Sequence, residues 1–292
     1  MPRLRNKIDG LLNFSDYRST KNKIIYSVFM FLLIIFTLTA LIPIVWLFIT
    51  SFKSVNEINS ITYHLFPEQF TLKKMLDVWN KVNFGAYYLN TLFVVIGAVI
   101  CSVFFNALLA YAIGVLKPVG HKIINALILL GYMIPSALAI YPLVSQISNL
   151  KLIDSYIPLW LAFGANAYYY LLFKDFFTKM PKSLIEAAKV DGLSDFKIFL
   201  KVVFPLSKSI MGVVSIFAMT AAYSDFLLPY TILQSTSKQT VMVAIYNLSS
   251  TTTLDASERL MLLVISIIPQ IIIFAIFQKQ IMNQSVNSGM KD

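Results

Sequence analysis

Charged residues and histidines are scarce in this chain of 292 residues, and it contains a single cysteine. Asp, Glu, Lys and Arg make up 13% of the residues against 58% hydrophobic ones, and the mean hydropathy is +0.72. Soluble domains carry about 25% charged residues, so this composition predicts an integral membrane protein. Cys101 alone excludes an intrachain disulfide framework and a cysteine metal cluster. His64 and His121 are too few and too far apart for a metal site or a histidine-based catalytic pair.

Sequence motifs for nucleotide chemistry are also lacking. The chain has no GxxxxGK[ST] loop, which would cradle phosphates, so we expect that it neither binds nor hydrolyses ATP. It has no Ser/His/Asp arrangement and no paired carboxylates outside a charged loop at 174–208. We therefore expect no enzyme: the chain should contain no catalytic residue, no metal and no cofactor of its own.

What the chain has instead is a series of long apolar runs. Six of them have roughly the length that a bilayer requires, at residues 24–51, 88–116, 123–144, 156–173, 209–224 and 260–277. The first is too long for the core of a signal peptide and is expected to be retained as a span. These runs predict an all-α, polytopic membrane protein with six transmembrane helices. The expected domains are an N-terminal tail at 1–23, a transmembrane domain at 24–281 and a C-terminal tail at 282–292.

The formal net charge of +10 is confined to one side of this topology. Of the 24 Lys and Arg residues, 17 lie on one side of the expected spans, in the segments 1–23, 117–122, 174–208 and 278–292. The acidic residues divide evenly between the two sides, 7 and 7. The positive-inside rule places these segments, and hence both termini, in the cytoplasm. Attraction to anionic membrane lipid accounts for the basic excess, so a nucleic-acid partner is not needed to explain it.

Residues 180–205 form the one long charged segment with a helical pattern between two apolar runs. Pro181 suits a first helical turn, Gly192 suits a helix end at positive φ, and Ser194 can cap a second helix. The segment therefore predicts a helix, a tight turn and a helix. An apolar stripe is expected on the second helix, formed by Phe196, Phe199, Leu200 and Val203.

Glu186, Ala187 and Ala188, followed by Asp191, Gly192 and Pro205, resemble the EAA loop of permease subunits in ATP-binding-cassette (ABC) importers. Residues 50–53, 90–92 and 287–291 look like the carbohydrate branch of that family, the maltose-permease type. In that family the loop is a coupling helix that docks in a cleft of a separate ATPase subunit. The resemblance implies a coupling role for a set of seven residues: Glu186, Ala187, Ala188, Asp191, Gly192, Phe196 and Pro205.

The resemblance further implies a permease subunit of a binding-protein-dependent importer for a sugar or oligosaccharide, in a bacterial plasma membrane. Its expected partners are a second permease subunit, ABC ATPase subunits that bind ATP and Mg²⁺, an extracellular solute-binding protein and membrane lipid. One alternative is an ABC permease for a non-sugar solute, because phosphate, peptide and amino-acid importers share the EAA loop. Another is a secondary transporter, although six spans are few for one and no internal repeat is evident.

The residues expected along the substrate pathway are Asp225, Tyr223 and Phe226. A carboxylate near membrane depth is costly and usually faces a water-filled cavity or a partner, and sugar-importer permeases have a polar, acidic and aromatic cluster at this place. Trp and Asn are usual in the family where this chain has Tyr223 and Ser224. The alternative is that Asp225 caps a helix end or pairs with Lys238 or Arg259.

Two further features fit either a pathway or ordinary membrane packing. Pro135 and Pro142 should bend the third span, and such bends can flank a pathway, but proline is also common in membrane helices. The three tyrosines at 168–170 suit an interfacial belt as well as a surface on which sugar rings stack.

Overall fold

The computed structural model describes residues 20–62, 64–250 and 253–289, and every element of regular structure in these ranges is helical. The chain divides into two compact units, Met1–Thr71 and Leu72–Asp292. Most of the expected N-terminal tail, residues 1–19, lies outside the described residues.

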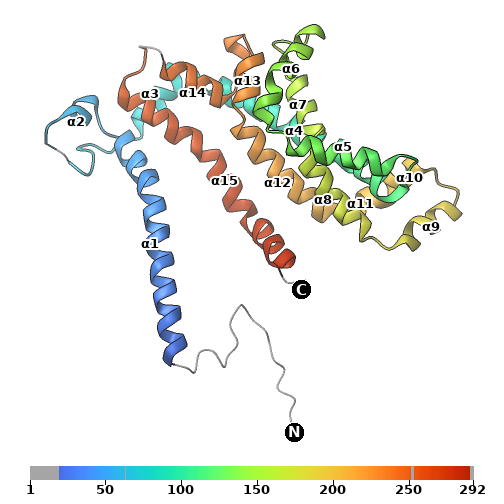
Figure 1. Cartoon of the computed structure of the whole chain (residues 1–292). Coiled ribbons are helices and arrows are strands. Elements are labelled where there is room, and N and C mark those ends of the chain that lie inside the picture. The colour runs from blue at the N-terminus through green and yellow to red at the C-terminus, as the bar shows by residue number, and fades with distance from the viewer. Residues whose placement is uncertain (1–19, 63, 251–252, 290–292) are drawn as a thin grey trace. The chain divides into compact units, whose positions relative to one another are not determined.

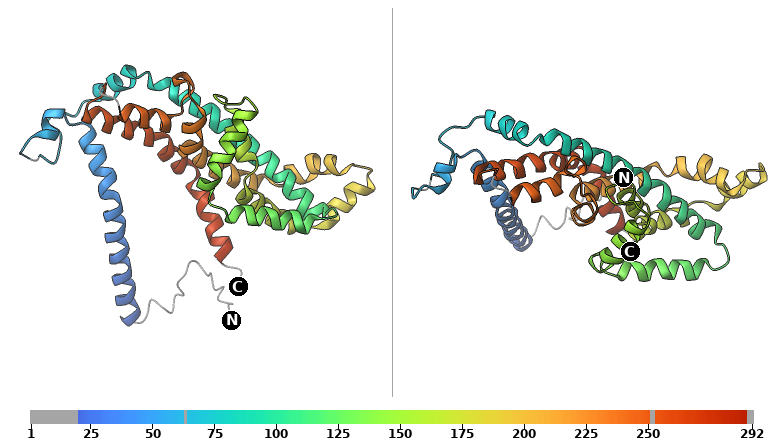
Figure 2. Two further views of the ribbon diagram at one scale, coloured as in Figure 1. Left: turned by 45° about the horizontal axis from the view of Figure 1, so that its top comes forward. Right: turned by 90° about the horizontal axis from the view of Figure 1, so that it is seen from above.

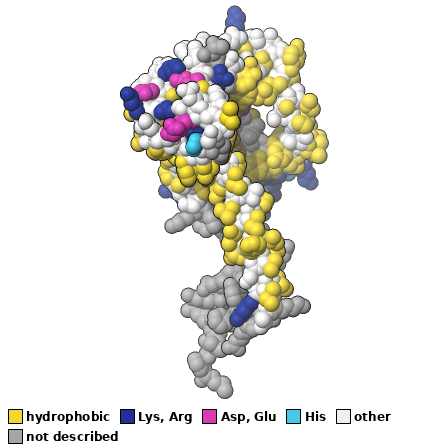
Figure 3. Space-filling model, turned by 90° about the vertical axis from the view of Figure 1, so that its left-hand side faces the viewer, with side chains coloured by type: hydrophobic (Ala, Val, Ile, Leu, Met, Phe, Trp, Pro, Cys, Tyr) yellow, Lys and Arg dark blue, Asp and Glu magenta, His cyan; other side chains and the backbone are white. Residues whose placement is uncertain are grey.

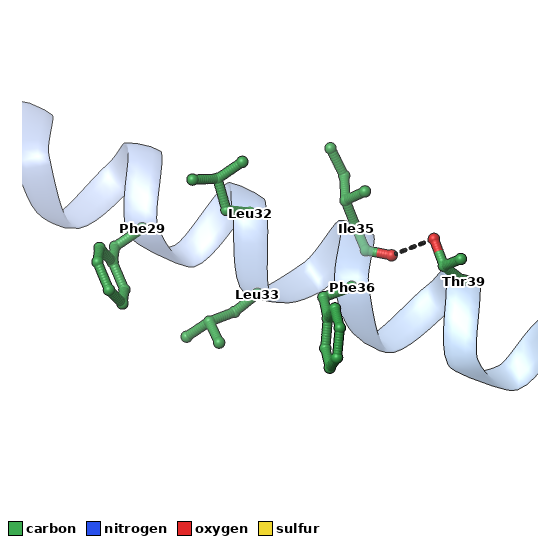
Figure 4. A pocket seen from close by; sticks show the side chains of 6 residues that line it. All are labelled: Phe29, Leu32, Leu33, Ile35, Phe36 and Thr39. Atoms are coloured by element: carbon green, nitrogen blue, oxygen red, sulfur yellow. Dashed lines mark hydrogen bonds between the residues drawn. The ribbon is translucent and has the colours of Figure 1, made fainter.

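The first unit contains the long helix α1 (Thr20–Ser51), which covers the first expected span. Its side chains are overwhelmingly apolar and exposed. Figure 3 shows one face of the molecule, with hydrophobic side chains in yellow and a group of charged side chains in its upper part. Figure 4 shows a shallow groove along α1, where the Thr39 hydroxyl donates to the Ile35 carbonyl at 2.8 Å. Thr37 donates to Leu33 in the same way. Hydroxyl groups satisfied within the helix and an apolar surface all round are what a lipid-facing span requires.

A short capped helix, α2 (Val55–Asn59), follows α1. Ser54 and Glu57 form a capping box, in which each side chain accepts a hydrogen bond from the backbone of the other residue. Just before it, Lys53 Nζ donates to the His64 carbonyl at 2.5 Å, and the ring centroids of Phe52 and Phe70 lie 4.1 Å apart. These contacts fold the segment after α1 back on itself, and they involve residues 52 and 53 of the 50–53 motif.

The second unit contains the remaining helices. Its elements in chain order are α3 (Lys73–Lys81), α4 (Phe84–Tyr111), the π-helix η2 (Ala112–Leu116), α5 (His121–Met133), α6 (Ser136–Asn149), α7 (Ile157–Gly164), α8 (Ala167–Thr178), α9 (Lys182–Val190), α10 (Asp195–Ile198), the π-helix η3 (Phe199–Val203), α11 (Phe204–Leu206), α12 (Lys208–Ser224), α13 (Leu227–Ile232), the 3₁₀ turn η4 (Thr236–Lys238), α14 (Val241–Ser249) and α15 (Ala256–Gly289). Figure 1 shows α9 and α10 at the opposite end of this unit from α3 and α14, and the views of Figure 2 agree.

Helix α4 is the centre of this unit, since α7, α8 and α12 all pack on it. Small residues make the close approach possible: Ala98, Ala107 and Ala110 on α4 are fully buried. At Gly97 the indole of Trp160 fills the space in which a side chain would lie. A Cβ at this position would be only 2.2 Å from Trp160 Nε1. The core is thus built by bulky α7 and α8 side chains that pack against an α4 surface with little side-chain volume.

The six expected spans are only partly matched by single helices. Among the described residues, three stretches are long and apolar enough to cross a membrane: Asn22–Ser51, Phe84–Leu116 and Ala256–Gln278. Two bent pairs raise the number to five: α5 with α6, bent by 108°, and the segment Asp195–Leu206 with α12, bent by 81°. The expected span at 156–173 is divided between α7 and α8. The expected tail at 282–292 is helical as far as Gly289, because α15 continues without a break.

At the end of the unit near α14, polar contacts hold the segment 233–240, here called the 233–240 loop. Asp154, with φ +60°, accepts hydrogen bonds from the Ser235 backbone at 3.0 Å and from its hydroxyl at 2.5 Å. Lys238 Nζ lies 3.2 Å from the Asp154 carboxylate, and the Tyr156 hydroxyl donates to the Lys238 carbonyl. Asn90, the first residue of the 90–92 motif, donates to two carbonyls of the loop. The loop is therefore fixed to α4 and to the turn before α7.

The Asp154 contacts predict a pH-dependent stability. Hydrogen bonds from Ser235 and the charge of Lys238 hold the pKa of Asp154 below its ordinary value, which is about 3.9. The stabilisation is then fully present above pH of about 4 and is lost as the pH falls through the lower, folded-state pKa. We expect Asp154→Asn to lower the free energy of unfolding by about 1 kcal/mol at pH 7 and to reduce the loss of stability on acidification.

The measurement is the midpoint of thermal unfolding in detergent between pH 7 and pH 3. Asp77→Asn, a change at an exposed carboxylate of α3, serves as the control and should follow the wild-type profile. Identical profiles for Asp154→Asn and the wild type would show that these contacts add nothing to stability.

Candidate functional site

The segment 180–205 folds as the expected helix, turn and helix. Helix α9 ends in a Schellman motif: the Leu193 N–H bonds the Ala188 carbonyl at 3.1 Å, and the Gly192 N–H bonds the Lys189 carbonyl at 3.0 Å. Gly192 has φ +76°, as its position in the pattern predicted. Lys189 also pairs with Asp195 across the turn at 3.4 Å. The turn is thus closed by the backbone around one glycine.

Most of the expected coupling residues lie on the surface of this hairpin. Of the seven, Ala188 is buried against the core and the other six are exposed: Glu186, Ala187, Asp191, Gly192, Phe196 and Pro205. The Phe196 side chain is 53% exposed, although it is aromatic. An exposed carboxylate and an exposed aromatic ring beside a rigid turn are suited to contact with another protein.

The second arm of the hairpin is anchored differently from the sequence prediction. Of the four residues of the expected stripe, Phe199 and Val203 are buried, whereas Phe196 and Leu200 are exposed; Ile198, outside the stripe, is also fully buried. Phe199 packs against Tyr111 at the end of α4, with 5.5 Å between ring centroids. The four residues of the stripe are therefore divided between a buried and an exposed side of the arm.

The irregularity of this arm has a local cause in Pro205. Proline has no backbone N–H, and residues 199–203 just before it wind as the π-helix η3, in which the Phe204 N–H bonds the Phe199 carbonyl five residues back. Ser207, fully buried, follows the short helix α11, and its hydroxyl donates to the Val203 carbonyl at 2.5 Å. The chain then turns by 81° into α12. The arm is therefore joined to α12 through a defined bend.

Two broken helices define a second site in the same unit. The α5–α6 pair is interrupted at Ile134 and Pro135, where the backbone is extended, and the α7–α8 pair at Ala165 and Asn166. Asn166 caps α8, because its Oδ1 accepts from the Tyr169 N–H at 3.1 Å. Irregular backbone at membrane depth is tolerated where it is buried in protein or lines a water-filled cavity.

A cleft of about 840 Å³ lies between these breaks and α4, here called the break cleft. No charged residue is among the described residues that line it, and its polar lining comes from Asn106, Tyr132, Ser136, Asn166, Tyr168 and Tyr170. Asn106 is buried, and its Nδ2 donates to the carbonyls of Ser102 and Phe163, while its Oδ1 has no partner. The cleft thus offers amide, hydroxyl and aromatic groups.

The three residues expected along the pathway lie elsewhere, at the junction of α12 and α13. Tyr223 is buried and its hydroxyl donates to the Ser266 carbonyl on α15 at 2.6 Å. Asp225 follows α12 directly and lies just before Phe226, the N-cap of α13. Lys238, a partner considered for it, pairs with Asp154 instead. Phe226 stacks on Tyr230, with 5.0 Å between centroids.

Phe226 belongs to a group of three aromatic rings that sequence reasoning did not assemble. Tyr246 of α14 lies 5.0 Å from Phe226 and 5.1 Å from Tyr230, and both tyrosines are exposed. The break cleft was missed as well, although Pro135 and the tyrosines at 168–170 were singled out. A polar Asn106 inside an apolar run was the signal that could have pointed to it.

The sequence matches, over residues 106–284, the family described as the inner membrane component of binding-protein-dependent transport systems. The chain is 30% identical over 262 residues to the diacetylchitobiose uptake system permease protein NgcG of Streptomyces coelicolor, covering 88% of this chain and 86% of that one. It is 26% identical over 265 residues to the sn-glycerol-3-phosphate transport system permease protein UgpE of Yersinia pestis, with 88% and 94% covered.

The fold is similar to that of a chain in the crystal structure of a bacterial ABC transporter involved in the import of the acidic polysaccharide alginate. The TM-score is 0.79, with 24% identity, and the match covers 89% of this chain and 98% of that chain. The fold is therefore that of an ABC transporter permease.

This chain belongs to the family of inner membrane permease components of binding-protein-dependent ABC transporters. It is the transmembrane component of such a system and has no catalytic role. A system of this type includes an ATPase and a solute-binding protein besides the permease. The secondary-transporter alternative is excluded by this membership.

Proposed function

We propose that this chain carries a neutral sugar or oligosaccharide across the bacterial plasma membrane. In this proposal it pairs with a second permease subunit, and its hairpin couples it to ATPase subunits that bind ATP and Mg²⁺. The observation that carries the proposal is the break cleft, since substrate sites in transporters are typically formed by discontinuous helices near the bilayer midplane. Its volume of about 840 Å³ falls within the range of small-molecule sites, roughly 300–1,000 Å³.

The lining of the break cleft favours a neutral solute. Amide and hydroxyl groups such as those of Asn106, Ser136 and Asn166 suit the hydroxyl groups of a sugar, and the Tyr132 and Tyr168 rings can stack on its apolar faces. A phosphorylated solute would require a cation, and the described lining contains none. The alternative of a non-sugar solute, supported by the similarity to a glycerol-3-phosphate permease, therefore fits this cleft less well.

The group at the α12–α13 junction is proposed as the outer approach to the pathway. Phe226, with Tyr230 and Tyr246, presents exposed rings, and Asp225 adjoins them. Tyr223 is buried below this group, so we expect it to act by holding α12 against α15 through Ser266.

Uptake in cells tests the proposed function. Cells that lack this chain should fail to accumulate one neutral oligosaccharide from a labelled panel that includes chito- and malto-oligosaccharides and glycerol 3-phosphate. Supplying the chain should restore uptake, and depletion of ATP should abolish it. The purified chain alone in liposomes should show neither ATPase activity nor uptake. Restoration of glycerol 3-phosphate uptake alone would overturn the neutral-sugar assignment.

We further propose six spans with both termini in the cytoplasm, in which the α7–α8 pair and the two bent pairs each cross once. Cysteine labelling tests this arrangement in a Cys101→Ala background. Val190→Cys, at a residue that is 88% exposed on the hairpin, should react with an impermeant maleimide only from the cytoplasmic side. Ser237→Cys, exposed on the 233–240 loop, should react only from outside. Labelling of both positions from one side would refute the topology.

A further inference from the structure

A second cleft, of about 220 Å³, lies beside the coupling hairpin and is not used by the function proposed above. It is bounded by the end of η2, the end of α8 and helix α9, and it is called here the lysine cleft. Its lining is Gly114, Val115, Lys117, Phe177, Thr178, Met180, Lys182, Ile185, Glu186 and Lys189. At Gly114 the α8 side chains approach closely, since a Cβ there would lie 3.2 Å from Lys174 Cγ and 3.6 Å from Thr178 Cγ2.

The charge of the lysine cleft is positive, with three lysines and one carboxylate. Lys189 pairs with Asp195, whereas Lys117 and Lys182 form no ion pair with any residue in the part of the chain that the structure describes. Lys117 is held in place by its backbone, because it ends η2 at φ +53° with its N–H bonded to the Ala112 carbonyl at 3.0 Å. Two ammonium groups from separate elements, neither in an ion pair among the described residues, therefore border one cleft together with the Glu186 carboxylate, which leaves an excess of positive charge.

The remainder of the lining is apolar. It is formed by Val115, Phe177, Met180 and Ile185. A site for a free inorganic anion would not require such apolar side chains. Val119, two residues after Lys117, is fully exposed on the turn before α5. An exposed apolar side chain beside lysines is typical of a segment at the boundary between headgroups and acyl chains. In the topology proposed above, the ends of η2 and α8 lie at the cytoplasmic face, where anionic lipid is concentrated.

We propose that the lysine cleft binds the headgroup of an anionic phospholipid, with the phosphate between Lys117 and Lys182 and the glycerol region against the apolar lining. Because α9 forms one wall, a bound lipid connects the membrane surface to the coupling hairpin and stabilises α9 in the position seen here. The inference rests on the proposed orientation but not on the identity of the transported solute.

The test uses the purified full chain in vesicles of phosphatidylcholine with a small fraction of spin-labelled lipid. Labelled phosphatidylglycerol should be immobilised by the protein in preference to labelled phosphatidylcholine. In the double variant Lys117→Gln, Lys182→Gln this preference should fall by about fivefold for each lysine removed, since a lysine near an anionic surface contributes about 1 kcal/mol. The control is Lys201→Gln, Lys208→Gln, which removes two exposed lysines of the same cytoplasmic segment outside the cleft and should keep the preference.

Three results would overturn the proposal. One is an unchanged preference in the Lys117, Lys182 variant, and another is an equal loss in the Lys201, Lys208 control, which would indicate attraction by total charge alone. The third is displacement of labelled phosphatidylglycerol by millimolar inorganic phosphate, which would reassign the cleft to a free anion. Lipid binding is read without transport, so loss of uptake with lipid preference intact would count against the proposed function and not against this site.

Discussion

Gly192→Val should abolish coupled uptake while leaving the membrane domain folded. Gly192 closes the Schellman turn at φ +76°, a conformation that costs an L-residue about 1–2 kcal/mol and a β-branched residue more. No atom lies within 4 Å of the position where a Cβ would be, so the effect comes from backbone strain and not from a clash. The strain is relieved if the turn opens, which displaces α9 from α10. We expect uptake to fall by at least about tenfold, the equivalent of ~1.4 kcal/mol.

Gly192→Asn provides the matched control, because Asn tolerates the left-handed region better than other residues with a Cβ. It adds a side chain at the same exposed place and should retain most of the uptake. Glu186→Ala should have an intermediate effect, since it removes an exposed charge without straining the turn. The measurements are uptake in cells and co-purification of the ATPase with the variant. Wild-type values of both for Gly192→Val would show that the hairpin is not the coupling element.

Ala162→Trp should block transport at the other site. Ala162 lies on α7, one turn before the α7–α8 break, and lines the break cleft. An indole at this position would occupy the space proposed for the solute, so we expect uptake to fall by about tenfold or more, corresponding to at least ~1.4 kcal/mol. The hairpin lies at a different place in the unit, so co-purification of the ATPase should be unchanged.

The control for this change is Leu161→Trp, one residue earlier on the same helix. Leu161 is 50% exposed and does not line the cleft. It should therefore accept the larger ring with little effect on uptake. If both variants transport normally, the break cleft is not the pathway. If both fail to accumulate in the membrane, Ala162→Ser and Ala162→Leu replace them, and uptake should then fall with the size of the side chain at position 162.

Gly192→Val and Ala162→Trp should both reduce uptake, but the first acts on coupling to the ATPase and the second on passage of the solute. Gly192→Val should reduce ATPase co-purification, whereas Ala162→Trp should retain it. This difference follows from the fold, in which α9 and α10 lie at the end of the unit reached by the last turns of α4, where Phe199 contacts Tyr111.

Local features of the fold were predictable because their causes are local. The turn at Gly192 depends on one residue that tolerates positive φ and on hydrogen bonds within six residues, and both were evident in the sequence. The apolar runs specified α1, α4 and α15 as long helices for the same reason. Pro205 was visible too, but the π-helix η3 that precedes it at Phe199–Val203 was not predicted.

The sequence by itself determined a membrane protein of helices and the hairpin between residues 180 and 205, since each follows from composition or from spacing along a few turns. Tertiary structure alone decided where the clefts are. Asn106, Ser136 and Asn166 lie in one cleft only because α5–α6 and α7–α8 break opposite α4, and Asp154 meets Lys238 only because α13 and the turn before α7 end at the same place. Contacts between residues 30 to 84 positions apart depend on how helices pack, and packing is set by shape and volume at the interface, which no periodicity along the chain encodes.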